Sequence, residues 1–214
     1  MNRAIIFVNG NLSDLGRVKE IITKNDYIIC ADGGVKHALK LKLTPQTVIG
    51  DFDSISPTLQ KKLAQKKIEL IKFPKKKNET DFELALQLAL KRNFTGIIIF
   101  GILGDRIDHL LANIFLITKI QTENQSIKIK IIEGNKEIFI LNKKIVINGQ
   151  IGDEISIIPV SEKLENIVTE GLEYQLDHET LFFGATRGVS NVMNKKTVKI
   201  TLSSGIAVVE HNLQ

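Results

Sequence analysis

The sequence has little cysteine and no long apolar stretch, and each absence excludes a class of protein. The single cysteine, Cys30, excludes an internal disulfide bond and a cysteine zinc site, and it fits a reducing cytosol. No apolar run approaches 18 residues, so no membrane-spanning helix is expected. The run Ala4–Val8 predicts a first strand and not a signal peptide. We therefore expect a cytoplasmic protein with no membrane partner.

Several motifs with known chemistry are also missing. The chain has no Gly-x-x-x-x-Gly-Lys-Ser/Thr loop of Walker-type ATPases and no Gly-x-Gly-x-x-Gly after the first strand for a dinucleotide cofactor. It has no Gly-x-Ser-x-Gly elbow for acyl transfer. The histidines lack the spacing of zinc ligands, and only His109 lies next to a candidate site.

The charge balance is basic, with a formal net charge of +5, and lysines cluster in several places, including the loop Lys72–Lys77. A basic surface can bind nucleic acid or another polyanion. No aromatic residues are interleaved with the lysines to stack bases, so we expect a solvated surface and no nucleic-acid partner. For Lys72–Lys77 itself, both phosphate binding and simple solvation remain open.

The first part of the chain alternates apolar runs with amphipathic stretches, and the 43% hydrophobic content can fill a core. Apolar runs predict buried strands at Ala4–Val8, Tyr27–Cys30, Thr47–Ile49, Glu69–Ile71 and Ile97–Phe100. Three- and four-residue spacing predicts helices at Leu15–Thr23, Val35–Leu41, Pro57–Ala64, Asp81–Leu90 and His109–Ile120. Thr80 and Glu83 form a candidate capping box for one of these helices. The alternation predicts a Rossmann-like α/β domain over residues 1–125, with a mostly parallel sheet.

After about Ser126 the pattern changes to alternation of apolar and polar residues, with turns such as Asn148-Gly149. The predicted strands are Ile127–Ile132, Glu137–Leu141, Lys144–Ile147, Glu154–Pro159, Val198–Leu202 and Ile206–Val209. This pattern predicts an antiparallel β-sandwich or barrel over residues 126–214.

Acidic residues follow successive strands of the predicted parallel sheet. Ligands of such sheets bind outside the carboxyl ends of the strands, so these carboxylates should converge on one edge. The residues concerned are Asp32, Asp51, Asp53, Asp81 and Asp108. A group of carboxylates without a histidine cluster suits Mg²⁺, which binds one or two carboxylates together with substrate phosphates. The leading class of chemistry is therefore phosphoryl transfer.

With these motifs, the chain resembles the thiamine pyrophosphokinase (thiamine diphosphokinase) family. The match rests on Ala31-Asp32-Gly33-Gly34, Gly50-Asp51-Phe52-Asp53-Ser54, Thr80-Asp81-Phe82 and Gly104-Asp105-Arg106-Ile107-Asp108-His109, and it continues through Gly171–Leu176 and Arg187–Asn191. Two departures stand out. Asp105 lies where relatives often carry a small residue, and Tyr174 lies where many carry tryptophan.

The resemblance implies a catalytic, ATP-binding α/β domain over 1–125 and a thiamine-binding, dimerising β-sandwich over 126–214. It implies a homodimer, and a Mg²⁺-dependent transfer of pyrophosphate from ATP to thiamine that releases AMP. It implies that Asp51, Asp53 and Asp81 bind the metal. The catalytic residues that it implies are these three aspartates together with Arg106 and Asp108. The expected substrate contacts are Asp32, Gly33, Gly34, Ser54, Thr80, His109, Ser190 and Asn191. Whether Tyr174 contacts thiamine or only packs stays open.

Within this framework we expect Arg106 to stabilise charge on the transferring group and Asp108 or His109 to orient or deprotonate the hydroxyl. One alternative is a pyrophosphokinase for another alcohol, such as a hydroxymethyl pterin. A second is a non-catalytic RNA-binding module, which would leave the carboxylates unexplained.

Overall fold

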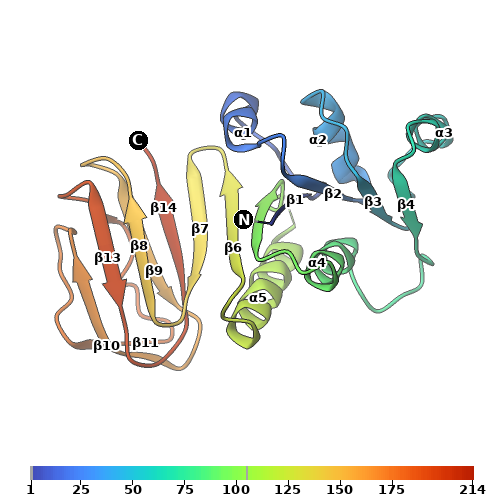
Figure 1. The fold of residues 1–214 in the computed structure, drawn as a ribbon. Coiled ribbons are helices and arrows are strands. Elements are labelled where there is room, and N and C mark those ends of the chain that lie inside the picture. The colour runs from blue at the N-terminus through green and yellow to red at the C-terminus, as the bar shows by residue number, and fades with distance from the viewer. Residues whose placement is uncertain (1, 105) are drawn as a thin grey trace. The chain divides into compact units, whose positions relative to one another are not determined.

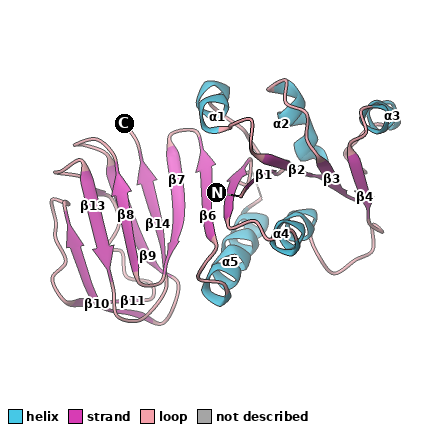
Figure 2. Cartoon of the chain, viewed as in Figure 1, coloured by secondary structure: helices cyan, strands magenta, loops and turns pink. Residues whose placement is uncertain are grey.

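The computed structural model describes residues 2–104 and 106–214, so Asp105 lies outside the described residues. The chain divides into two compact units, residues 1–134 and 135–214. Every helix of the described residues lies in the first unit, and strands occur in both (Figure 2). None of the described helices is long and apolar enough to cross a membrane.

The first unit is built on a parallel sheet whose strands run in the order β6-β5-β1-β2-β3-β4 (Figure 1). Every neighbouring pair in this series is parallel. The strands are β1 (Arg3–Phe7), β2 (Tyr27–Ala31), β3 (Thr47–Gly50), β4 (Glu69–Lys72), β5 (Gly96–Phe100) and β6 (Lys128–Glu133). The central strands are buried on both faces, which explains their continuous apolar sequence.

Helices cover both faces of this sheet: α1, α2 and α3 lie on one side, and α4 and α5 lie on the other (Figure 1). They are α1 (Leu15–Ile21), α2 (Val35–Lys40), α3 (Pro57–Gln65), α4 (Asp81–Lys91) and α5 (Ile107–Glu123). The α1–α3 side closes over a core that includes Val18, Ala38 and Leu63. The strands and helices predicted for residues 1–125 are confirmed, and no end differs by more than three residues.

The strand order places a switch point between β1 and β5. The chain proceeds from β1 outward to β4, then returns to the other side of β1 with β5 and β6. At such a point the loops leave adjacent strands in opposite directions, which opens a crevice at the carboxyl ends. The fold therefore offers a binding site beside β1, β2, β3 and β5.

The strands of the second unit form two antiparallel layers, β12-β9-β14-β7, which is part of the ten-stranded sheet, and the four-stranded sheet β11-β10-β13-β8. Its strands are β7 (Lys136–Leu141), β8 (Lys144–Asn148), β9 (Glu154–Pro159), β10 (Lys163–Glu170), β11 (Glu179–Phe182), β12 (Asn191–Val192), β13 (Thr197–Thr201) and β14 (Ala207–Asn212). One apolar core joins both sheets, with Ile157 and Val209 from one and Leu164 and Ile200 from the other. This is the predicted sandwich.

The strand predicted at residues 127–132 is present, but it was expected in the antiparallel part of the chain. That segment is β6, which pairs parallel with β5 and so belongs to the first unit. Alternating polarity reports one-sided burial, which a strand of either direction can have. The division between the units therefore falls after β6, later than the expected boundary at residues 125 and 126.

Strand β10 is absent from the sequence-based prediction for a visible reason. Its pairing with β11 shifts register between Leu164 and Ile167. The buried apolar side chains Leu164 and Ile167 are consequently three residues apart, which breaks the two-residue period.

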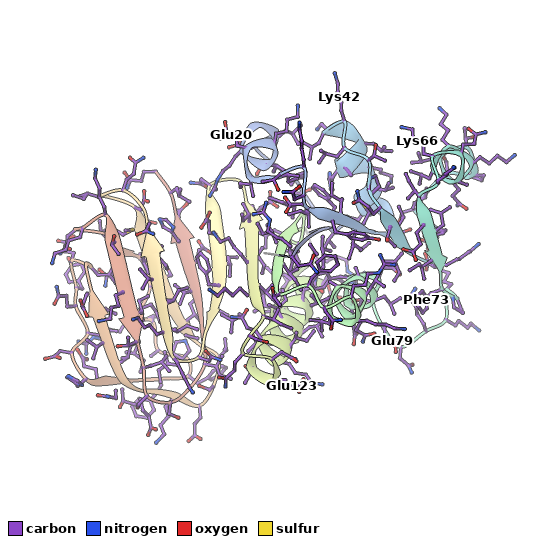
Figure 3. The ribbon with its side chains drawn as sticks, viewed as in Figure 1. Glu20, Lys42, Lys66, Phe73, Glu79 and Glu123 are labelled. Atoms are coloured by element: carbon purple, nitrogen blue, oxygen red, sulfur yellow. The ribbon has the colours of Figure 1, made fainter. Side chains whose placement is uncertain are left out.

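Many lysines of the first unit are solvated, as expected. Lys42 and Lys66 are exposed and point outward in Figure 3. The loop that follows β4 is different, because two of its lysines contact carboxylates, as described below.

Candidate active site

A cavity of about 640 Å³ lies at the carboxyl ends of the strands in the first unit. The loops after β1, β2, β3 and β5 contribute to it, together with the starts of α4 and α5. Its described lining residues are Val8, Asn9, Gly10, Asn11, Ala31, Asp32, Asp51, Asp53, Ser54, Thr80, Asp81, Phe82, Ile102, Gly104, Arg106, His109 and Asn113. The convergence expected from the strand ends is thus observed for four aspartates.

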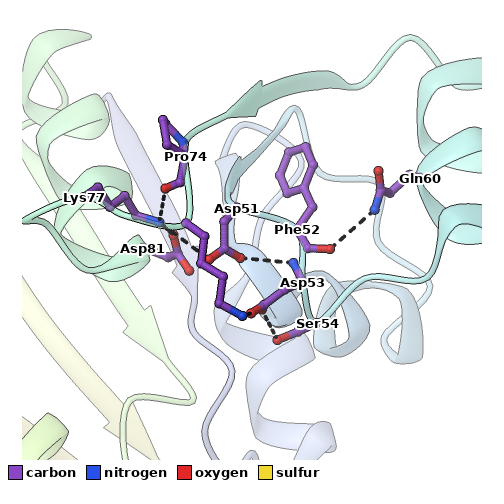
Figure 4. Close-up of polar contacts among 9 residues, drawn as sticks. Asp51, Phe52, Asp53, Ser54, Gln60, Pro74, Lys77 and Asp81 are labelled. Carbon is purple, nitrogen blue, oxygen red and sulfur yellow. Dashed lines mark hydrogen bonds and ion pairs between the residues drawn. The ribbon is translucent and has the colours of Figure 1, made fainter.

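The loop after β3 presents Asp51 and Asp53 through a tight turn (Figure 4). The Asp53 backbone N–H donates to Oδ1 of Asp51 at 3.0 Å, and Ser54 Oγ donates to Asp53 at 3.3 Å. Between them, Phe52 has φ of 65° and a buried ring that anchors the turn. The apolar residue between the two acids holds the backbone while both carboxylates face the cavity.

Gly50 allows the carboxylates of Asp32 and Asp81, which belong to different elements, to lie close to the end of β3. Its φ is 150°, and a Cβ atom there would lie 3.0 Å from Cβ of Asp32 and 3.1 Å from Cγ of Asp81. A side chain at this position would therefore push apart the acids that follow β2 and begin α4. The glycine is required by close packing of the site as well as by its backbone conformation.

The closest carboxylate group is Asp32, Asp51 and Asp53, whose nearest oxygens lie within 4.8 Å of one another. Asp32 is 94% buried by residue exposure, and its Oδ1 makes no hydrogen bond with any described residue. A buried carboxylate oxygen without a partner is costly unless something binds it. All the donors are oxygens, so the group fits a hard divalent cation.

Asp81 has a nearly buried protein cation as its partner. Lys77 Nζ lies 2.9 Å from Asp81 and 3.9 Å from Asp51, and its side chain is only 10% exposed (Figure 4). Burial raises the pKa of the Asp81 carboxyl above its ordinary value; Lys77 opposes this shift, and the charges of Asp51 and Asp32 add to it. The predicted metal set of Asp51, Asp53 and Asp81 thus lies at the cavity, with Asp32 closer to the first two.

Lys75 makes a second contact of the same kind, but on the surface. Its Nζ donates to Oδ2 of Asp53 at 2.9 Å, while the side chain remains 78% exposed. The ion pair lowers the pKa of Asp53. Two lysines of the loop Lys72–Lys77 are therefore directed at the carboxylates, which simple solvation would not require.

Arg106 and Asp108 form an exposed pair at the start of α5. Arg106 Nε donates to Asp108 Oδ1 at 3.1 Å, and a second guanidinium nitrogen donates to Oδ2. This bond lowers the pKa of Asp108. Arg106 and His109 line the cavity; Asp108 is not among the lining residues that the structure describes.

Gly33 and Gly34 are buried beneath the cavity and are not among its described lining residues. A Cβ at Gly34 would lie 2.2 Å from the Phe7 carbonyl oxygen, and one at Gly33 would meet the side chain of Asn9 at 2.3 Å. These glycines let the turn after β2 pack against the end of β1. They shape the site through packing, while Asp32 before them reaches the cavity.

Ser190 and Asn191 lie in the second unit. The Asn191 amide is used twice within that unit: Oδ1 accepts from the Tyr174 N–H at 3.0 Å, and Nδ2 donates to the Tyr174 carbonyl at 2.6 Å. Asn191 thus holds the backbone of Tyr174, whose side chain is 69% exposed. The Ser190 N–H donates to Ser156 Oγ.

Sequence reasoning missed several lining residues. Asn9, Gly10 and Asn11 directly follow β1, so the strand-end rule applies to them as it does to the aspartates. Asn113 carries a weaker signal, a polar residue on the apolar face of a predicted helix. The buried cation Lys77 carries no distinguishing signal within a run of lysines.

Comparison with known proteins matches both units to one family. The model of the thiamin pyrophosphokinase catalytic domain matches residues 18–131, and that of the thiamin pyrophosphokinase vitamin B1 binding domain matches residues 142–207. A thiamine pyrophosphokinase of Bacillus subtilis (strain 168) is 31% identical over 182 residues, covering 84% of each chain. One from Oryza sativa subsp. japonica is 25% identical over 205 residues, covering 83% of this chain and 76% of the relative.

The fold has solved counterparts. The crystal structure of thiamine pyrophosphokinase from Bacillus subtilis superposes with a TM-score of 0.89 at 25% identity, and all of each chain is covered. Thiamin pyrophosphokinase from Candida albicans keeps a TM-score of 0.85 at 16% identity, covering all of this chain and 89% of the other, which shows the shared fold.

Proposed function

The chain belongs to the thiamin pyrophosphokinase family, and we propose that it transfers the pyrophosphoryl group of ATP to the hydroxyl group of thiamine, giving thiamine diphosphate and AMP. The observation that carries this proposal is the convergence of Asp32, Asp51, Asp53 and Asp81 on one cavity at the switch point of a parallel sheet. Such a concentration of carboxylates suits metal-assisted phosphoryl chemistry.

We propose Mg²⁺ as the cofactor, held by Asp32, Asp51 and Asp53 with Asp81 beside them. The unpartnered Asp32 Oδ1 and the all-oxygen donor set support this choice. An ion bound by these residues would supply positive charge that offsets the negative charge developing on the phosphate groups. Of the remaining carboxylates, Asp81 already has the Lys77 ammonium as its counter-charge.

In the reaction, the thiamine hydroxyl oxygen attacks the β-phosphorus of ATP. A new P–O bond forms, the bond between the β-phosphorus and the bridging α–β oxygen breaks, and AMP leaves with the electron pair of that bond. Arg106 stabilises charge on the transferring group, as its planar guanidinium can bind two phosphate oxygens. Lys75 exchanges its Asp53 contact for the triphosphate, which its 78% exposed side chain can reach without unfolding the loop.

The hydroxyl proton must pass to a base as the new bond forms. Between the two expected bases, His109 lines the cavity, whereas Asp108 is bonded to Arg106 and has a lowered pKa. A carboxylate that is a weaker base than usual suits positioning of Arg106 better than proton transfer. We therefore assign the proton acceptor to His109 and the orientation of Arg106 to Asp108.

We propose that the second unit binds thiamine and that the protein is a cytoplasmic homodimer. The vitamin B1 binding model covers residues 142–207, and Asn191 fixes an exposed Tyr174 there. Phe182 and Phe183 are 61% and 69% exposed, and large exposed apolar side chains in one segment are typical of an interface. Sedimentation equilibrium should give twice the mass of one chain, and a monomer would contradict the proposal.

The first experiment is AMP release from ATP and Mg²⁺ with and without thiamine, with chromatography for thiamine diphosphate. We expect thiamine-dependent AMP and an equal amount of thiamine diphosphate, and we expect EDTA to abolish both. No AMP with thiamine would contradict the assignment. Hydroxymethyl pterins would then be assayed in the same way, and RNA binding without Mg²⁺ would support the non-catalytic alternative.

The variant Asp53→Ala should lose at least about 100-fold in turnover, because a lost transition-state interaction with charge typically costs that much. Its fold should remain, since Asp53 is exposed. Asp177→Ala is the matched control, as it removes an 86% exposed carboxylate in the second unit. Full activity of Asp53→Ala would remove Asp53 from the mechanism.

A further inference from the structure

Asn113 is a buried polar side chain that the chemistry described above does not use. It lies on α5, is 5% exposed, and lines the cavity. Its amide makes no hydrogen bond with any residue that the structure describes. Its amide atoms are not among the fully enclosed unpartnered atoms of the described residues, so the small exposed part of this side chain faces the cavity, where a ligand can reach it.

The position on the helix indicates where the amide points. The buried residues of α5 include Asn113, Ile117 and Ile120, which share one face at four- and three-residue spacing. Ile117 and Ile120 pack into the unit, and Asn113 is the member of this face that borders the cavity. An apolar residue at this position would pack equally well on the buried face. The amide is therefore available to a ligand that occupies the cavity.

The other buried polar residue of this helix shows the contrast. The Thr118 hydroxyl donates to the Ile114 carbonyl at 2.8 Å, so its polarity is satisfied within the helix. Thr118 is not among the described residues of the cavity lining. Burial of a polar group on α5 therefore does not by itself leave the group unpartnered.

We propose that Asn113 is a specificity-determining residue that hydrogen-bonds the nucleoside part of the bound nucleotide. This inference rests on the proposed function. In the proposed reaction, the phosphates of the nucleotide bind near the carboxylates of Asp32, Asp51 and Asp53 and near Arg106 at the start of α5. Asn113 lies seven residues further along, about 10 Å at 1.5 Å per residue.

A neutral amide matches a neutral partner that both donates and accepts hydrogen bonds, such as a base edge or a ribose hydroxyl. The cavity also has apolar walls, including Val8, Phe82 and Ile102. An apolar pocket with a few placed polar groups is the usual environment of such a ligand.

The test compares Asn113→Leu with the matched control Thr118→Val, both in the full chain. Calorimetry would measure the Kd of a non-hydrolysable ATP analogue with Mg²⁺ and, separately, the Kd of thiamine. Asn113→Leu should bind the analogue about ten-fold more weakly, the loss of one to two hydrogen bonds, with thiamine affinity unchanged. Thr118→Val should leave both affinities unchanged.

A stability measurement separates this role from a structural one. Because the amide has no partner in the ligand-free protein, Asn113→Leu should keep or raise the thermal midpoint without ligands. A lowered midpoint with unchanged nucleotide affinity would overturn the proposal, as would an effect on thiamine alone. If the leucine variant does not fold, Asn113→Asp, which keeps the shape but loses the donors, should show the same loss of nucleotide affinity. Nucleotide binding is measured on the wild type without turnover, so a failure of the proposed reaction would be seen separately.

Discussion

At the scale of single residues, the negative charges of the aspartates in the site are partly neutralised by two lysines, which differ in their exposure to solvent. Lys77 is almost buried against Asp81 and Asp51, whereas Lys75 is exposed above Asp53. A buried ion pair loses stability when one partner is removed, because the other charge remains desolvated. An exposed pair contributes little. The two lysines of one loop should therefore behave differently.

We predict that Lys77→Met lowers the free energy of unfolding of the ligand-free protein by about 1–3 kcal/mol, because Asp81 and Asp51 lose their counter-charge. Lys75→Met, the matched control, should unfold like the wild type. Urea denaturation followed by circular dichroism would measure both. A larger effect in Lys75→Met would contradict the assignment of Lys77 as the buried counter-ion.

At the scale of elements, the first residues of α4 both stabilise the helix and contribute to the candidate site. Thr80 caps the helix, since its hydroxyl accepts from the Glu83 N–H at 3.1 Å, and Asp81 is the first helical residue. The predicted capping box is only half formed, because the Glu83 carboxylate accepts from Gln87. The Thr80 cap therefore helps to fix the backbone of Asp81, whose carboxylate is also held by Lys77.

Thr80→Ala should destabilise the protein by about 1 kcal/mol, the usual effect of losing a cap, and should also lower turnover. Ser56→Ala is the control: Ser56 caps α3 through the Leu59 N–H, and α3 contributes no described residue to the cavity lining. It should lose similar stability in urea denaturation while retaining turnover. Equal turnover in both variants would show that Asp81 is positioned without the cap.

At the scale of the whole molecule, the second unit contains a buried polar cluster that includes residues of its last strand, β14. Asp153 and His211 are each 1% exposed, and His211 Nε2 lies 2.8 Å from Asp153 Oδ2. Asp153 also accepts the backbone N–H groups of Gln150 and Gln214. Burial opposes ionisation of Asp153, but these hydrogen bonds and His211 outweigh it and lower its pKa.

This shift predicts acid sensitivity with a defined sign. The folded-state pKa of the Asp153 carboxyl lies below its ordinary value of 3.8, so its ionised form stabilises the fold fully at pH values above 3.8. This contribution disappears as the pH falls through the lower pKa of the folded state. Asp153→Asn should be less stable than the wild type by about 2 kcal/mol at neutral pH. Thermal unfolding from pH 7 to pH 2.5 should show the two converging in acid, and a constant difference would contradict the prediction.

The sequence by itself determined the alternation of strands and helices in the first unit and the two-residue period of the second. These signals are local: an apolar run or a repeat of three and four residues follows from the side chains alone. It also determined that Asp32, Asp51, Asp53 and Asp81 share one edge of the sheet, because parallel strands bring their carboxyl ends together. The motifs that carry the family resemblance are of the same local kind.

Only the tertiary structure decided which groups within the site meet. It pairs β6 in parallel with β5, buries Lys77 against Asp81, turns Asp108 toward Arg106, and leaves Asn113 without a partner beside the cavity. Each of these outcomes depends on distances between segments far apart in the chain, or on which neighbour fills a given space. Local patterns do not contain that information, because burial and pairing are properties of the packed whole.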